Sequence, residues 1–163
     1  MIMPVLTSAD LMPLLPEIVV ILGAFALLML DLFVDERRRF LVHAGGIAVL
    51  AVATVMIATG VGGQGTVLNG MFVRDIAADV MKVAIGVVSM LSMVYAWSYL
   101  RARELYKGEV AVLMLFATAG MMLLVSAGSL VMVYLGLEML ALSSYALVAI
   151  DRDGPVASEA AIK

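Results

Sequence analysis

Long apolar stretches, separated by short polar segments, dominate the chain. Five of them are long enough to be helices that cross a lipid bilayer: Leu14–Phe33, Phe40–Gly60, Ile76–Leu100, Val110–Ala127 and Leu130–Ile150. An α-helix rises ~1.5 Å per residue, so about 20 apolar residues cross a hydrocarbon core of ~30 Å. Prolines occur only at positions 4, 13, 16 and 155, outside these runs or at their edges. The pattern therefore predicts an all-α membrane protein with five continuous transmembrane helices.

The last residues predict the start of a sixth helix. The segment Ser158–Lys163 begins with a good N-cap residue and continues with helix-forming residues. A helix shorter than ~12–15 residues is marginal when isolated. We therefore expect this chain to form the front part of a longer protein.

The charges of the connecting segments predict the topology of the helices. Eight of the ten Lys and Arg residues fall on one side of the predicted bundle: Arg37, Arg38, Arg39, Arg101, Arg103, Lys107, Arg152 and Lys163. Arg74 is the one basic loop residue expected on the opposite side. The positive-inside rule places the eight residues in the cytoplasm and the N-terminus outside. Trp97 and Tyr99 are expected in the aromatic belt at the cytoplasmic interface.

The other connections predict how the helices pair. The Gly-rich segment Val61–Arg74 is expected to be an external connection, without the Gly-Lys-Ser/Thr motif of a phosphate-binding loop. The tight turn Ser126–Ser129 predicts that the last two apolar helices form an antiparallel pair. Close helix packing is expected along a face of the second helix that carries the small residues Ala44, Ala48, Ala51 and Ala58.

The composition supports the membrane class and excludes several functions. Hydrophobic residues make up 64% of the chain, charged residues 14%, and the mean hydropathy is +1.14. The net charge of −3 and the lack of a basic patch argue against a nucleic-acid partner. The absence of cysteine excludes thiolate zinc sites and cysteine-ligated iron–sulfur clusters in this chain. No basic residue precedes the first apolar run, so we expect that helix to be retained rather than cleaved.

Glu138 is the strongest candidate for a functional residue. It lies in the middle of the run Leu130–Ile150, where a central charge costs roughly 2.5–3.5 kcal/mol on insertion scales. Tyr134 and Tyr145 share its helical face and can hydrogen-bond the carboxylate or a water molecule. We interpret Glu138 as a proton or ion site with a cationic partner or a water-filled cavity nearby. The alternative is a permanently protonated acid in a structural hydrogen bond between helices.

Two lysines are further candidates. Lys82 lies in the first turns of the third helix, and Asp79, three residues earlier, is expected to pair with it while its stem extends outward. The alternative is a supporting role for Lys82 in proton transfer. Lys163 is either a terminal charge or, if the sixth helix continues, part of a proton relay near the cytoplasmic side.

The remaining ionisable residues are expected to be structural. Asp31 is predicted to form an interfacial ion pair with Arg37 or Arg38, and His43 to be a polar anchor near the cytoplasmic start of the second helix. A lone histidine cannot form a metal site. No nucleophile–base pair, cluster of metal ligands or dinucleotide-binding fingerprint occurs in the sequence. We therefore expect no catalytic chemistry in this chain alone.

The segments Val133–Ile150 and Ser158–Lys163 resemble subunit N of bacterial NADH–quinone oxidoreductase, an antiporter-like membrane subunit of respiratory complex I. The opening segments Leu14–Ile18 and Leu30–Phe33 resemble the start of the same subunit. The resemblance covers essentially the whole chain and about the first third of the family's length. The central glutamate alone is shared with the related subunits L and M and with multisubunit cation/proton antiporters.

This resemblance implies a fold of two inverted five-helix repeats that follow N-terminal helices. Residues 1–107 would hold helices one to three, and residues 108–163 would begin the first repeat. Glu138 matches the family's intramembrane glutamate, whose partner is a lysine on a later, broken helix. Lys163 matches the lysine at the start of the sixth helix. The chain ends before the broken helices and their lysines.

The function implied by the resemblance is proton translocation coupled to quinone reduction elsewhere in the complex. The chain would be a non-redox subunit without a cofactor, since NADH, flavin, iron–sulfur clusters and quinone would bind other subunits. Antiporter-like subunit M and a K-type subunit would be its neighbours in the bacterial inner membrane. The alternatives are a subunit of a multisubunit cation/proton antiporter, or a structural membrane scaffold.

Overall fold

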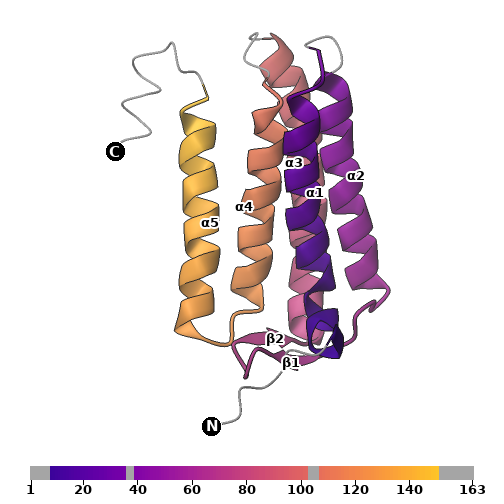
Figure 1. The fold of residues 1–163 in the computed structure, drawn as a ribbon, viewed down its shortest axis with the longest axis vertical. Coiled ribbons are helices and arrows are strands. Elements are labelled where there is room, and N and C mark those ends of the chain that lie inside the picture. Colours follow the sequence, from indigo (N-terminus) through magenta and orange to yellow (C-terminus); the bar gives the residue numbers. More distant parts are fainter. Residues whose placement is uncertain (1–7, 36–38, 103–106, 151–163) are drawn as a thin grey trace.

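The computed structural model describes residues 8–35, 39–102 and 107–150, which form a bundle of roughly parallel and antiparallel helices (Figure 1). The helices are a short 3₁₀ segment η1 (Ser8–Leu14), α1 (Leu15–Asp31), α2 (Arg39–Ala58), α3 (Ile76–Ala102), α4 (Glu109–Val125) and α5 (Leu130–Val148). Two short strands, β1 (Gly65–Val67) and β2 (Phe72–Arg74), form an antiparallel hairpin between α2 and α3. The helical class expected from the hydropathy pattern is confirmed.

Four helical stretches of the described chain have the length and apolar character needed to cross a membrane. They are Leu11–Asp31, Arg39–Ala58, Ile76–Ala102 and Leu130–Val148. The fourth of the five predicted spans, α4, is apolar but has 17 residues and is shorter than the others. The structure therefore supports a helical membrane protein with four long spans and one shorter apolar helix.

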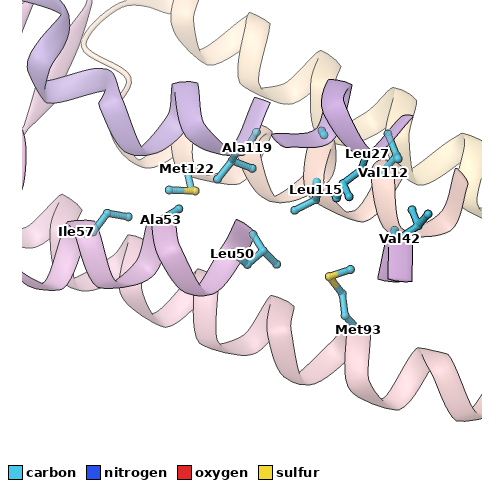
Figure 2. Packing of buried hydrophobic residues seen from close by; sticks show 13 residues of the cluster. Leu27, Val42, Leu50, Ala53, Ile57, Met93, Val112, Leu115, Ala119 and Met122 are labelled. Carbon is cyan, nitrogen blue, oxygen red and sulfur yellow. The ribbon is translucent and has the colours of Figure 1, made fainter. Parts of the chain in front are cut away.

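The core of the bundle lies where α1, α2, α3 and α4 meet. Figure 2 shows Leu50 of α2, Met93 of α3 and Leu115 of α4 converging on this core, and each is almost completely buried. Val20 and Leu27 of α1 complete it from the opposite side. Helices in lipid associate through close van der Waals packing rather than through exclusion of water, so this interdigitation holds the four helices together.

The packing face of α2 differs from the one predicted. Ala48 and Ala58, expected at a close helix contact, are exposed, whereas Gly46 and Ala53 are buried. A Cβ added to Gly46 would lie 2.7 Å from the terminal methyl carbon of Met93 on α3. Within the described residues α2 contacts the other helices through Gly46 and Ala53, and the close contact expected at Ala48 and Ala58 stays a prediction.

The Gly-rich connection after α2 contains a β-hairpin that the sequence did not predict. The β1–β2 hairpin lies across the end of the bundle at which α1 begins and α4 turns into α5 (Figure 1). The backbone N–H of Val73 donates to the carbonyl of Ser126 at 2.8 Å, and the N–H of Gly128 donates to the carbonyl of Met71 at 2.8 Å. These bonds fasten the hairpin to the α4–α5 turn.

Candidate functional site

Glu138 lies half-buried near the middle of α5, a helix of 19 residues. The phenol of Tyr134, one turn earlier, interacts with the Glu138 carboxylate. Because a phenol can donate and a carboxylate can accept, a hydrogen bond between them would satisfy one of the acid's acceptor positions. Tyr145 lies on the same face at i+7 and is exposed. The structure places Tyr134 beside Glu138, and the roles of the two tyrosines stay a prediction.

Most of the surface of α5 is open in the described part of the chain. The helix packs chiefly against α4, and only Met132, Gly136 and Ser143 are buried in it. Its exposed apolar residues include Leu130, Val131, Leu135, Leu137, Leu142 and Val148. Glu138 therefore sits beside a face that leaves room for a further helix or for water next to the carboxylate.

Several predicted partners lie outside the described residues. Lys163 is one of them, so its proposed relay stays a prediction. Arg37 and Arg38 are also outside, and the interfacial ion pair expected for Asp31 stays a prediction for the same reason. The Asp31 carboxylate lies directly against the position where a Cβ of Gly108 would be, at the start of α4.

Lys82 is buried and pairs with a residue that was not expected. Its ammonium nitrogen lies 2.5 Å from Oε1 of Glu17 in the first turn of α1, and the side chains are 0% and 1% exposed. Asp79 instead bonds Arg74, whose Nε donates to Asp79 Oδ1 at 2.7 Å. The predicted Lys82–Asp79 pair and the outward extension of Lys82 are therefore wrong, because Arg74 occupies Asp79 and α1 brings Glu17 to Lys82.

Arg74 and Phe72 of β2 complete this cluster of buried charges. Arg74, predicted as an external loop residue, is 1% exposed, and its Nη1 donates to the carbonyls of Val61 at 2.8 Å and Pro13 at 3.4 Å. The Lys82 ammonium lies 4.8 Å from the centre of the Phe72 ring, which favours the cation. Two acids and two bases thus balance one another where α1, β2 and α3 meet.

The only histidine joins two helices inside the bundle. His43 is 2% exposed, and its Nε2 lies 2.9 Å from the carbonyl oxygen of Met93 on α3, to which it donates. Its ring also lies 5.1 Å from that of Trp97. The structure therefore places His43 in a contact between α2 and α3 rather than facing the membrane interface. Across the described ranges, no group of three or more His, Cys, Asp or Glu residues could hold a metal ion.

Comparison with known proteins identifies relatives along almost the whole chain, although no protein-family profile matches it. NADH-quinone oxidoreductase subunit N of Xanthomonas euvesicatoria pv. vesicatoria is 68% identical over 158 residues, which are 97% of this chain and 32% of that protein. Proteins of the same name from Methylovorus glucosotrophus and Neisseria gonorrhoeae are 41% and 38% identical, over 96% of this chain and 33% of their own length.

The chain thus spans about a third of the length of the curated relatives that it matches. These alignments cover nearly the whole chain at identities of 38% to 68%. They confirm the resemblance predicted from Val133–Ile150, Ser158–Lys163 and the opening segments. The chain is a homologue of the N-terminal portion of NADH-quinone oxidoreductase subunit N.

Proposed function

We propose that this chain is part of a proton-translocating membrane subunit of NADH–quinone oxidoreductase, and that Glu138 carries protons in it. The observation that supports this proposal is an ionisable acid near the middle of α5, beside Tyr134 and an open helical face. The names of the relatives supply the complex. Ionisable groups at this depth are costly in lipid and mark ion pathways and proton relays.

The geometry around Glu138 suits a group that changes its protonation. A phenol that donates a hydrogen bond stabilises a carboxylate, whereas a lipid environment favours a neutral acid. A cation that approaches on the open side of α5 would release the proton, and its withdrawal would favour protonation. The proposed cation is a lysine on a later helix, and Lys163 is proposed as a further relay group.

The other assignments follow from the same proposal. NADH, flavin, iron–sulfur clusters and quinone would bind other subunits, and this chain would transfer no electrons. Its 17-residue α4 would complete five transmembrane helices at the lower limit of spanning length, as the start of an inverted-repeat bundle. The N-terminus would lie outside the bacterial inner membrane, and the antiporter-like subunit M and a K-type subunit would be neighbours.

The test replaces Glu138 in the complete complex. Glu138→Gln removes the titratable group with little change of shape, and we expect NADH-driven proton uptake by inverted membrane vesicles to fall. Glu138→Asp keeps an acid and should retain more uptake. Glu109→Gln removes a carboxylate from the first residue of α4 and is the matched control. Normal proton uptake per NADH oxidised in Glu138→Gln would overturn the proposal.

A further inference from the structure

We propose that Glu17 and Lys82 form a second proton-exchange site, at the hairpin end of the bundle and separate from Glu138. The two side chains come from different helices, α1 and α3, and meet at 2.5 Å between Lys82 Nζ and Glu17 Oε1. Both are almost completely buried. An acid and an amine at this separation can share a proton directly.

Proton transfer within the pair conserves its charge. In the ionised form the Lys82 ammonium holds three protons and the Glu17 carboxylate none. Movement of one proton from Nζ to Oε1 gives a neutral amine and a neutral carboxylic acid, with a total charge of zero in both forms. A proton taken up from water leaves the acid beside the ammonium, and its release restores the original pair.

The pair lacks the contacts that would make it a permanent ion pair. A buried salt bridge compensates the loss of hydration only when further hydrogen bonds satisfy its remaining lone pairs and protons. Among the described residues, Glu17 Oε2 has no hydrogen-bond partner, and Lys82 Nζ has none beyond its contact with Glu17. The neutral form therefore costs less desolvation than the ionised form, and the two forms become close in free energy.

The neighbouring pair Arg74–Asp79 has the additional hydrogen bonds that the Glu17–Lys82 pair lacks. Arg74 donates to Asp79 and to two backbone carbonyls, and a guanidinium does not lose its proton in proteins. Asp79 is partly exposed, with 16% of its side chain accessible. This pair is suited to a fixed structural role. Its chemistry differs from that of Glu17–Lys82 although both occupy the same end of the bundle.

The surrounding groups keep the ionised form of the pair accessible. Lys82 of α3 and Arg74 of β2 are the charged groups that act on Glu17 in the described structure, and both favour its carboxylate. The Phe72 ring favours the Lys82 ammonium. These contributions oppose the cost of desolvation. The result is a pair that a small change in its surroundings can shift between its two forms.

A groove beside α3 is the route by which we expect solvent to reach the pair. An open groove of about 360 Å³ lies between the end of α2 and the start of α3, and Asp79 lines it with Ile57, Gln64 and Val80. Asp79 precedes Lys82 by three residues, which is less than one turn of α3. Neither Glu17 nor Lys82 lines the groove, so proton exchange with water in it requires side-chain movements that expose one of the two groups. A role in translocation rests on the proposed function; proton exchange at this pair does not.

Infrared difference spectroscopy of the complete protein tests the proposal. Subtracting the spectrum of Glu17→Gln from that of the unaltered protein should reveal the C=O stretch of a protonated Glu17 carboxyl near neutral pH, and the band should grow on acidification. Lys82→Arg should abolish the band near neutral pH, because a guanidinium cannot give up its proton to Glu17. Absence of the band at every pH at which the protein stays folded, or its persistence near neutral pH in Lys82→Arg, would overturn the proposal.

Control variants separate protonation from folding. The double variant Glu17→Leu/Lys82→Met replaces the buried pair with apolar residues, which is often neutral or stabilising. It should remain folded in thermal unfolding and lack the band. Asp79→Asn should keep the Glu17 band. Glu138→Gln should also keep it, so a failure of the proposed function at Glu138 is distinguishable from a failure here.

Discussion

Gly120 of α4 and Gly136 of α5 lie in tight contact between these two helices. A Cβ added to Gly120 would lie 2.8 Å from the carbonyl oxygen of Gly136 and 2.9 Å from the backbone nitrogen of Leu140. Both clashes are with backbone atoms, which a rotamer change cannot relieve. The position of Glu138 relative to α4 therefore depends on two residues without side chains.

The first prediction is that Gly120→Ala destabilises the protein. The added methyl must push α5 away from α4, and overpacking of this kind costs about 1–3 kcal/mol. Thermal unfolding in detergent, followed by circular dichroism, measures the loss. Ala48→Val adds carbon atoms on the exposed side of α2 and is the matched control. An equal effect of both variants would contradict close packing at Gly120.

The second prediction concerns Arg74, which holds the hairpin, η1 and α3 together. Arg74→Met leaves Asp79 and the carbonyl of Val61 without their donor, and removal of one partner of a buried ion pair costs roughly 3–5 kcal/mol. The partial exposure of Asp79 places the expected loss at the lower end, because water can solvate the remaining charge. Chemical denaturation in mixed detergent measures it.

The control for Arg74 is Arg101→Met at the exposed end of α3. Arg101 lies 6.0 Å from the centre of the Trp97 ring, an exposed contact worth about 0.5–1 kcal/mol. Arg74→Met should therefore be clearly more destabilising than Arg101→Met. If the two variants unfold alike, Arg74 does not hold the hairpin in the way that its hydrogen bonds indicate.

The positions of the helices could be predicted from the sequence, because lipid imposes a minimum apolar length on every span. The predicted run Phe40–Gly60 corresponds to α2 at Arg39–Ala58, and Ile76–Leu100 corresponds to α3 at Ile76–Ala102. Pro16 lies at the edge of the first apolar run and, in the structure, in the first turn of α1. These features depend on local composition, which a single sequence contains in full.

The Glu17–Lys82 pair could not be predicted in the same way, because it depends on how α1 packs relative to α3. Local spacing favours Asp79 as the partner of Lys82, and nothing in the sequence shows that Asp79 instead pairs with Arg74. A signal was nevertheless present: Glu17 and Lys82 are both ionisable residues inside apolar runs and near the same predicted end of the bundle. Opposite charges at one depth are candidates for pairing.

The hairpin was missed for a different reason. Strands of three residues, such as Gly65–Val67 and Phe72–Arg74, are too short to show an alternating pattern. Their order depends on hydrogen bonds to the α4–α5 turn, which lies far along the sequence. A glycine allows the tight turn between the two strands, because Gly70 adopts a positive φ of +84°.

The third prediction concerns Ser129, the N-cap of α5. Its hydroxyl oxygen accepts a hydrogen bond from the backbone N–H of Met132 at 3.3 Å. Ser129→Ala should cost about 1 kcal/mol, whereas Ser129→Gly should cost a few tenths. Ser144→Ala removes a hydroxyl that donates to its own helix and is the control. Unfolding midpoints that do not rank in this order would argue against capping by Ser129.

The fourth prediction concerns Thr118 of α4 and Ser89 of α3, whose hydroxyl oxygens lie 3.0 Å apart in the buried interface between the helices. Thr118 also lies 2.8 Å from the carbonyl of Met114, so when its single proton is donated there, Ser89 donates to Thr118. A double-mutant cycle of Thr118→Val and Ser89→Ala should give a coupling free energy of about 0.6 kcal/mol, the average for hydrogen bonds between membrane helices.

Such a modest value has a physical reason: the unfolded helices in a membrane also find partners for their hydroxyls, within their own backbones or with one another. The single variant Thr118→Val additionally loses the bond to Met114, which the cycle removes from the coupling term. A control cycle with Thr118→Val and Ser144→Ala, on different helices and without a mutual bond, should give a coupling near zero. Equal coupling in both cycles would mean that the Thr118–Ser89 contact does not stabilise the α3–α4 interface.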